Sequence, residues 1–135
     1  MLRALVPAML LLSGCTMTAA ESARADAAQA RDEARLSKTL AGREAGKPTD
    51  CIDPRTLNSS VYGDAILYQF GTGKAWLTRT QGGCFGLSRD DIIVTRSFTG
   101  QLCRGDIVRT VDRTSGFPSG SCTFGEFVPY TKIKR

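Results

Sequence analysis

Cysteine is the residue type with the most clearly defined chemistry in this chain. There are five cysteines and no histidine. The four that follow residue 50 are Cys51, Cys84, Cys103 and Cys122. Without histidine and without a Cys-x-x-Cys spacing they do not resemble a zinc site, so no metal is expected. An even number of cysteines in a small exported chain instead predicts two disulfides.

The fifth cysteine, Cys15, ends a segment typical of export signals. Arg3 precedes an apolar run over residues 4–12, which is far shorter than the roughly 20 residues needed to span a bilayer. The run leads into Leu-Ser-Gly-Cys, and these four residues resemble the lipobox of bacterial lipoproteins. The resemblance implies a signal peptide over residues 1–14 and a Cys15 that is acylated and begins the mature chain. The alternative is an ordinary signal peptide with an incidental cysteine.

The lipobox resemblance also implies a location. Thr16, rather than an aspartate, follows Cys15, which in lipoproteins of this kind favours the outer membrane. We therefore expect a lipid-anchored protein of the cell envelope that faces the periplasm and contacts the membrane through its anchor.

Four cysteines allow three pairings, and their spacing leaves all three open. We favour Cys51–Cys122 together with Cys84–Cys103, because Cys51 and Cys122 lie near the two ends of the domain and small barrels often bring their ends together. A bridge there would close the longest loop, which the chain-entropy model predicts to be the most stabilising. The second choice is Cys51–Cys84 with Cys103–Cys122.

The residues give little support for catalysis. Without histidine, neither a Ser-His-Asp triad nor a Cys-His pair can form, so we predict that the protein is not an enzyme and needs no cofactor. A pair of carboxylates, as in glycoside hydrolysis, remains an alternative. The candidate acids are Asp53, Asp64, Asp90, Asp91, Asp106, Asp112 and Glu126. The adjacent Asp90 and Asp91 fall far short of a calcium ligand set.

Two further features concern binding. Arg104-Gly105-Asp106 spells an integrin-binding tripeptide, but glycine and aspartate are also common turn residues, and we predict a turn. The net charge of +5 is compatible with an anionic envelope polymer or lipid headgroups as partner, or simply with solvating surface charge. No basic-aromatic motif for nucleic acid is present.

Composition divides the mature chain near residue 50. Residues 15–50 are rich in alanine and mixed in charge, and they contain no aromatic residue. Alanine, arginine and glutamate favour helix, but only Leu36 and Leu40 could face a core. We therefore predict a partly helical tether over residues 19–40, which acts as a spacer or alternatively binds a partner.

Residues 51–135 form the second part, and alternating apolar residues predict β-strands there. Residues 65–70 and 74–79 flank Gly71-Thr72-Gly73, which predicts a β-hairpin. Further strands are expected over residues 57–62, 91–98, 107–111 and 122–133. In the strand over residues 91–98, Ile92, Val94 and Phe98 should lie on one side. Five to six short antiparallel strands with two disulfides predict a mainly β domain, either a small barrel or a sandwich.

Several motifs centred on cysteines recur in order along this domain. They are Cys51-Ile52-Asp53, Asp64, Cys84 with Gly86-Leu87, Leu102-Cys103-Arg104-Gly105-Asp106, and Cys122 with Gly125 and Phe127. In this respect residues 51 to about 129 resemble an uncharacterised family of small bacterial exported proteins, the domain of unknown function DUF6491. The resemblance implies no activity and no catalytic residue.

The sequence thus leaves three hypotheses about function. The first is a non-enzymatic, lipid-anchored module that binds an envelope protein or an anionic polymer. The second is a carboxylate-based hydrolase acting on cell-wall glycans, and the third is a small inhibitor of a hydrolase. For the first hypothesis we expect arginine and aromatic side chains to gather on one face of the domain.

Overall fold

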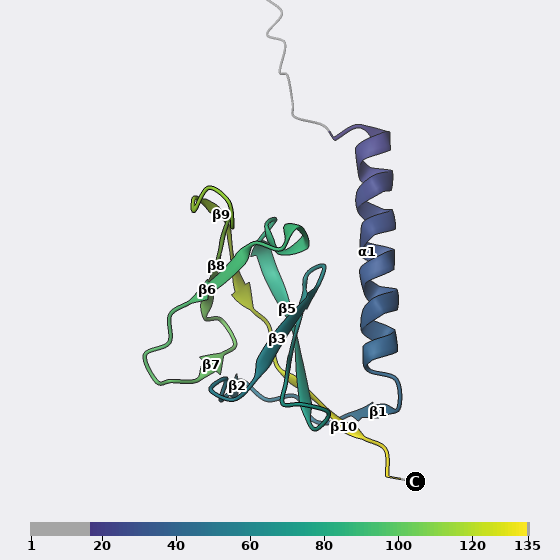
Figure 1. Ribbon diagram of the computed structural model, residues 1–135, viewed down its shortest axis with the longest axis vertical. Coiled ribbons are helices and arrows are strands. Elements are labelled where there is room, and N and C mark those ends of the chain that lie inside the picture. Colours follow the sequence, from purple (N-terminus) through teal and green to yellow (C-terminus); the bar gives the residue numbers. More distant parts are fainter. Residues whose placement is uncertain (1–16, 135) are drawn as a thin grey trace, which may run out of the picture.

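The computed structural model describes residues 17–134, which fold into one α-helix beside an antiparallel sheet (Figure 1). Helix α1 spans Ala19–Thr39. The strands are β1 (Arg43–Ala45), β2 (Cys51–Ile52), β3 (Asn58–Tyr62), β4 (Ala65–Gln69), β5 (Ala75–Gly83), β6 (Ile92–Thr95), β7 (Leu102–Cys103), β8 (Ile107–Val111), β9 (Pro118–Phe124) and β10 (Val128–Lys132), with a short 3₁₀ helix η1 over Leu87–Arg89. The mainly β, antiparallel class predicted from the sequence is confirmed.

The long strand β5 organises the main sheet. One edge of β5 pairs with β4, and β4 pairs with β3. Along the other edge β10 pairs with Leu77 and its neighbours, and β9 pairs with residues 80–83. Between β9 and β10, the Gly125 N–H donates to the Arg79 carbonyl at 2.9 Å. A Cβ at Gly125 would lie 2.6 Å from that carbonyl oxygen, so only glycine lets the chain follow β5 this closely.

The sheet does not close into a barrel. Beyond β9 the order continues to β8 and then β6, while β1 lies outside β10. On one side of β5 the sheet ends at β3. On the other side it has two branches, which end at β6 and at β1. A separate pair, β2 with β7, packs its Ile52 and Leu102 into the core.

The larger core cluster includes residues from strands on both sides of β5. Phe124 and Phe127 are completely buried, with ring centroids 5.5 Å apart, and Tyr68 lies 6.3 Å from each ring. Ile66 shares this side with Tyr68, as predicted from their alternation. Phe70, predicted to lie on the same face, is instead exposed just beyond the end of β4.

The other side of β4 and β5 is also buried, because α1 covers it. Leu36 is only 3% exposed and packs with Ala65, Leu67, Ala75 and Leu77. Polar contacts surround this apolar contact: Arg79 donates to both carboxylate oxygens of Glu33 at 2.7 and 3.1 Å, and the Thr39 and Tyr62 hydroxyls are 3.0 Å apart. Helix α1 thus forms a second layer of the fold.

The extent of the helix was predicted within one residue. Its predicted role as a free tether does not agree with its packing on the sheet. Thr18 and Glu21 form a reciprocal capping box at its start, and after it β1 pairs with β10. Residue 50 therefore does not separate a spacer from a domain. Small alanines on the sheet allow the helix to approach, so two leucines are enough to hold it. No helix among the described residues is long and apolar enough to cross a membrane.

Candidate functional site

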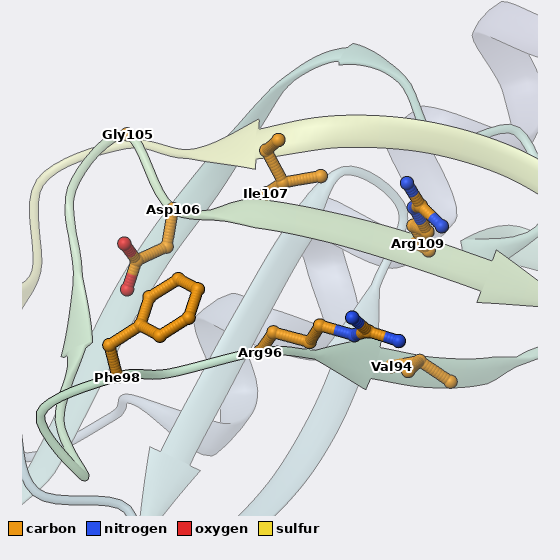
Figure 2. A pocket seen from close by; sticks show the side chains of 7 residues that line it. All are labelled: Val94, Arg96, Phe98, Gly105, Asp106, Ile107 and Arg109. Atoms are coloured by element: carbon orange, nitrogen blue, oxygen red, sulfur yellow. The ribbon is translucent and has the colours of Figure 1, made fainter.

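Strands β6 and β8 carry the most distinctive surface of the molecule. They pair antiparallel, with Val94 opposite Arg109 and Thr95 opposite Val108. On β8 the side chains alternate, so that Val108 and Thr110 are buried while Ile107 and Arg109 point to solvent. We call the outer surface formed by Val94, Arg96, Phe98, Ile107 and Arg109 the β6–β8 face (Figure 2).

The apolar side chains of the β6–β8 face are unusually accessible. Phe98 is 100% exposed, Ile107 57% and Val94 41%. Together with the two arginines and Asp106 they line a shallow pocket of about 440 Å³ (Figure 2). Single exposed apolar residues are common on proteins, but a group of them beside polar residues is typical of a binding surface.

The arginines of the face differ from most of the others in the structure. Arg35, Arg55, Arg79, Arg89, Arg104 and Arg113 each form an ion pair. Arg96 and Arg109 form none within residues 17–134. The same holds for Arg24, Arg31 and Arg43, of which Arg31 and Arg43 donate hydrogen bonds to backbone carbonyls. The carboxylate that lines the same pocket, Asp106, accepts a hydrogen bond from the Cys103 N–H at 2.8 Å. With two arginines and one carboxylate, the pocket combines a net positive charge with apolar surface.

Such an arrangement is suited to binding a ligand that carries both an acidic and an apolar group. A guanidinium can donate two parallel hydrogen bonds to a carboxylate or a phosphate. The exposed Phe98, Val94 and Ile107 can cover the apolar part of the same ligand. The face has one carboxylate, which is engaged by the backbone, and the lining residues include no thiol or hydroxyl nucleophile.

The sequence pointed to half of this face. Ile92, Val94 and Phe98 were predicted to share one side of a strand, and Arg96 lies between them in the chain. Periodicity does not tell which side faces solvent here, because Ile93 on the opposite side is apolar as well. The strand is also shorter than predicted, ending at Thr95, and Phe98 extends from the loop that follows.

Arg104-Gly105-Asp106 forms the predicted turn. Gly105 has a φ of +86°, a value that favours glycine. The Asp106 N–H donates to the Cys103 carbonyl at 3.0 Å, and its carboxylate accepts from the Cys103 N–H. Arg104 lies 3.9 Å from Asp50. The tripeptide therefore serves local structure at the edge of the β6–β8 face.

The two disulfides form, but both of the pairings considered above are wrong. The bonds are Cys51–Cys103 and Cys84–Cys122. Cys51 and Cys103 lie directly opposite each other in the β2–β7 ladder. The ends of the domain do meet, through a bridge between Thr49 and Phe127, but Cys122 lies on the buried middle of β9, beside the end of β5. Cys84 follows that end and is the cysteine it can reach.

Most candidate acids have structural partners. Arg55 holds the pKa of the Asp53 carboxyl at about 2, through hydrogen bonds from its side chain and its backbone. Hydrogen bonds from Ser115 and Thr114 lower the pKa of Asp112. Asp64 pairs with Arg79, and Asp90 with Arg113. Asp91 is buried, with one oxygen that has no hydrogen-bond partner, and Glu126 lines a separate pocket.

The described residues contain no group of three histidine, cysteine or acidic residues that could hold a metal ion. Cys15, the predicted acylation site, lies outside the described residues.

The motifs that carried the family resemblance lie at positions that stabilise the fold. Ile52, Leu87, Leu102 and Phe127 belong to the core. A Cβ at Gly86 would lie 2.0 Å from an oxygen of Asp91. These motifs thus account for the disulfides, the close contacts and the packing, whereas the β6–β8 face is built largely from other residues.

Comparison with protein families agrees with the resemblance. The model of the "Family of unknown function (DUF6491)" matches residues 1–134. No curated protein and no solved structure matches the chain. The match covers nearly the whole chain, and the protein therefore belongs to this family.

Proposed function

We propose that this DUF6491 protein is a non-enzymatic, lipid-anchored module of the cell envelope that binds an acidic partner through the β6–β8 face. The observation that carries the proposal is the pair of arginines without ion-pair partners, Arg96 and Arg109, among three exposed apolar side chains. A protein or an anionic polymer with apolar groups next to its acids would complement this face in both charge and hydrophobicity.

The anchor is the second component of the proposal. Cys15 of the lipobox-like Leu-Ser-Gly-Cys would carry the acyl chains, and two such chains suffice for stable attachment. Thr16 favours the outer membrane. Since α1 begins at Ala19 and packs on the sheet, the anchor would hold a rigid body close to the bilayer rather than a domain on a long flexible spacer.

The experiment that tests binding uses the full mature protein purified from membranes in detergent. Its affinity for polyglutamate and for polyphosphate is compared with that for neutral dextran, at low and at moderate salt. We expect binding to the anionic polymers that weakens with salt. The double variant Arg96→Glu/Arg109→Glu should lose at least tenfold in affinity.

A matched control carries the same change in net charge away from the face. Arg24→Glu/Arg31→Glu alters two exposed residues on α1. We expect this variant to keep most of the affinity. An equal loss in both double variants would show that only net charge matters and would contradict the proposed site. Absence of binding to every acidic probe, polymer or peptide, would contradict the proposed function itself.

The hydrolase and inhibitor alternatives stay predictions from the sequence. No specific contact favours either of them, so we develop only the binding function.

A further inference from the structure

Strand β6 is an edge strand, and its open edge borders a groove. Within residues 17–134, β6 pairs only with β8, and β3 only with β4. Beside these two edges lies a groove of about 700 Å³. Its walls come from residues 59–63 of the β3 side, from residues of α1 and η1, and from Ile92 and Ile93 at the start of β6. We call it the β3–β6 groove. It lies where the sheet would have to close to become a barrel.

The backbone of β6 has hydrogen-bonding groups to offer at this edge. In an antiparallel pair, alternate residues direct their N–H and C=O groups to the partner strand, and the residues between them direct theirs to the other side. Half of the four residues Ile92–Thr95 therefore face away from β8. Apart from the bonds to β8, no backbone hydrogen bond joins these four residues to another described segment.

The composition of β6 differs from that of a protected edge. Natural proteins usually blunt an open edge with lysine, proline or inward-pointing charges. The edge strand β1 follows this rule with Arg43 and Glu44. The sequence of β6 is Ile-Ile-Val-Thr, which contains no charge and consists of residues that favour strands. The side chains of β6 therefore do not oppose pairing of its open edge with another strand.

Charge distinguishes the two ends of the β3–β6 groove. Near Ile92 each acid has an arginine partner: Asp90 pairs with Arg113, Asp32 with Arg35, and the buried Asp91 lies 3.8 Å from Arg89. Beyond Thr95 the strand leads to Arg96, which lies on the β6–β8 face with Arg109 (Figure 2). A strand laid along β6 would therefore place an acidic side chain best near Arg96.

We propose that β6 binds an extended acidic peptide segment as an added strand. The segment occupies the β3–β6 groove, pairs with the backbone of β6, and directs alternate side chains over the β6–β8 face, an acidic one to Arg96 and Arg109 and an apolar one to Val94. Strand addition of this kind takes its affinity from the main chain and its specificity from alternate side chains. The inference rests on the proposed function and names the class of partner as a peptide segment of a protein.

The geometry favours a peptide over the bilayer of the anchor. In Figure 1, α1 and β8 lie on opposite sides of the ribbon, and α1 reaches β6 only through Asp32 and Arg35, which line the groove at the Ile92 end. Unpaired amides at strand spacing also match another peptide backbone, whereas a headgroup or a polyphosphate chain would engage only the arginines.

The test measures binding of a fluorescent peptide, acetyl-Ser-Glu-Thr-Val-Thr-Glu-Ser-amide, to the full mature protein in detergent. Two further peptides carry N-methyl groups on one or the other set of alternate residues, which removes amide donors from one edge of the peptide at a time. We expect one of the two to lose about tenfold or more in affinity, because it can no longer donate to β6. On binding of the unmodified peptide, amides within residues 92–95 should gain protection from hydrogen exchange.

Protein variants locate the acidic contact. Arg96→Glu should weaken the unmodified peptide by about tenfold, and the control Arg24→Glu should leave its affinity unchanged. Neither substitution alters a buried residue, since both arginines are exposed, so the variants can be compared as folded proteins.

The outcomes separate this inference from the proposed function. Equal affinity of all three peptides, with binding still dependent on Arg96, would overturn strand addition and leave the acidic binding face intact. Binding of polyphosphate but not of any peptide would likewise overturn it in favour of a polymer ligand. A concentration-dependent dimer in sedimentation experiments that the peptide dissociates would assign the edge to a second copy of the chain and overturn the proposed partner. No binding of any acidic probe would remove the proposed function as well.

Discussion

At the scale of single residues, burial changes the chemistry of one phenol. Tyr68 packs against Phe124 and Phe127 in the core. Loss of hydration there penalises the phenolate and raises the pKa of Tyr68 to about 12. Because the folded state favours the neutral form, its contribution to stability is complete below the ordinary pKa of 10 and is lost as the pH rises through the folded value.

We expect this effect in an alkaline titration followed by ultraviolet absorbance. The Tyr68 phenolate should appear only as the pH approaches 12, together with loss of the folded circular dichroism signal. Tyr68→Phe removes that late step and should make stability less dependent on pH above 10. A titration of the folded protein that is already complete near pH 10 would contradict the burial of this hydroxyl.

Also at the scale of single residues, two arginines indicate a binding surface, whereas the acids do not. An arginine is charged at every relevant pH, so an unpaired pair such as Arg96 and Arg109 marks a surface with an unbalanced charge. The acids Asp53, Asp106 and Asp112 each accept hydrogen bonds from residues within three positions in the chain. These carboxylates are accounted for by turns.

At the scale of elements, α1 depends on one buried side chain. Leu36 is the buried apolar residue of the helix, and it contacts the outer side of β4 and β5. Isolated helices of this length are marginal in water, so packing must supply most of the stability of the docked helix. The ion pair of Glu33 with Arg79 is largely exposed and contributes less.

Replacing Leu36 with alanine should therefore destabilise the protein by about 2–3 kcal/mol, as large-to-small changes in cores do. Chemical denaturation followed by circular dichroism measures this change. The matched control is Leu40→Ala, because Leu40 is only partly buried against the same cluster, and it should cost clearly less. Equal and small effects of both changes would mean that the helix is not docked in solution and would restore the idea of a free tether.

At the scale of the whole molecule, the disulfides hold separate parts of the fold. Cys51–Cys103 joins β2 to β7 within their pair, and Cys84–Cys122 joins the end of β5 to β9 inside the core. Mapping of unreduced peptides should find these two links and no Cys51–Cys122 or Cys51–Cys84 link. Under mild reduction Cys51–Cys103 should open first, because both of its cysteines are partly exposed while Cys84 and Cys122 are buried.

Removal of the buried bridge should be costly. Cys84→Ala/Cys122→Ala should lower the free energy of unfolding by about 2–4 kcal/mol, the usual value of a disulfide. Cys51→Ala/Cys103→Ala serves as the comparison, with a loop of similar length. If loss of Cys51–Cys103 unfolded the protein while loss of Cys84–Cys122 left its stability unchanged, the assignment of Cys84–Cys122 as the core bridge would be wrong.

The proposed lipid anchor concerns the whole chain. We predict that Cys15→Ser abolishes acylation and releases the protein from the membrane fraction, because the acyl chains on Cys15 would be its attachment. Fractionation with immunodetection, together with mass spectrometry of the N-terminus, provides the measurement. Unchanged membrane retention of this variant would refute the lipid anchor.

The sequence by itself determined what local patterns encode. Alternation of apolar residues predicted the β4–β5 hairpin and β8, the alanine-rich stretch predicted α1 within one residue, and the Gly105-Asp106 pair predicted a turn. An even number of cysteines predicted two disulfides. Each of these features depends on neighbours along the chain, through dihedral preferences, hydrogen bonds over a few residues, or side-chain periodicity.

The tertiary structure decided what depends on contacts between distant segments. Cys84 bonds to Cys122 because the end of β5 meets the middle of β9, and no spacing of cysteines reports that meeting. Leu36 makes a helix part of the fold because alanines from β4 and β5 leave room for it. Val94 and Ile107 are exposed, and Arg96 and Arg109 lack ion-pair partners within residues 17–134, because no other segment of this described part packs on the outer side of β6 and β8. An apolar residue has the same identity whether it is covered or not, so only the assembled sheet can reveal a binding face.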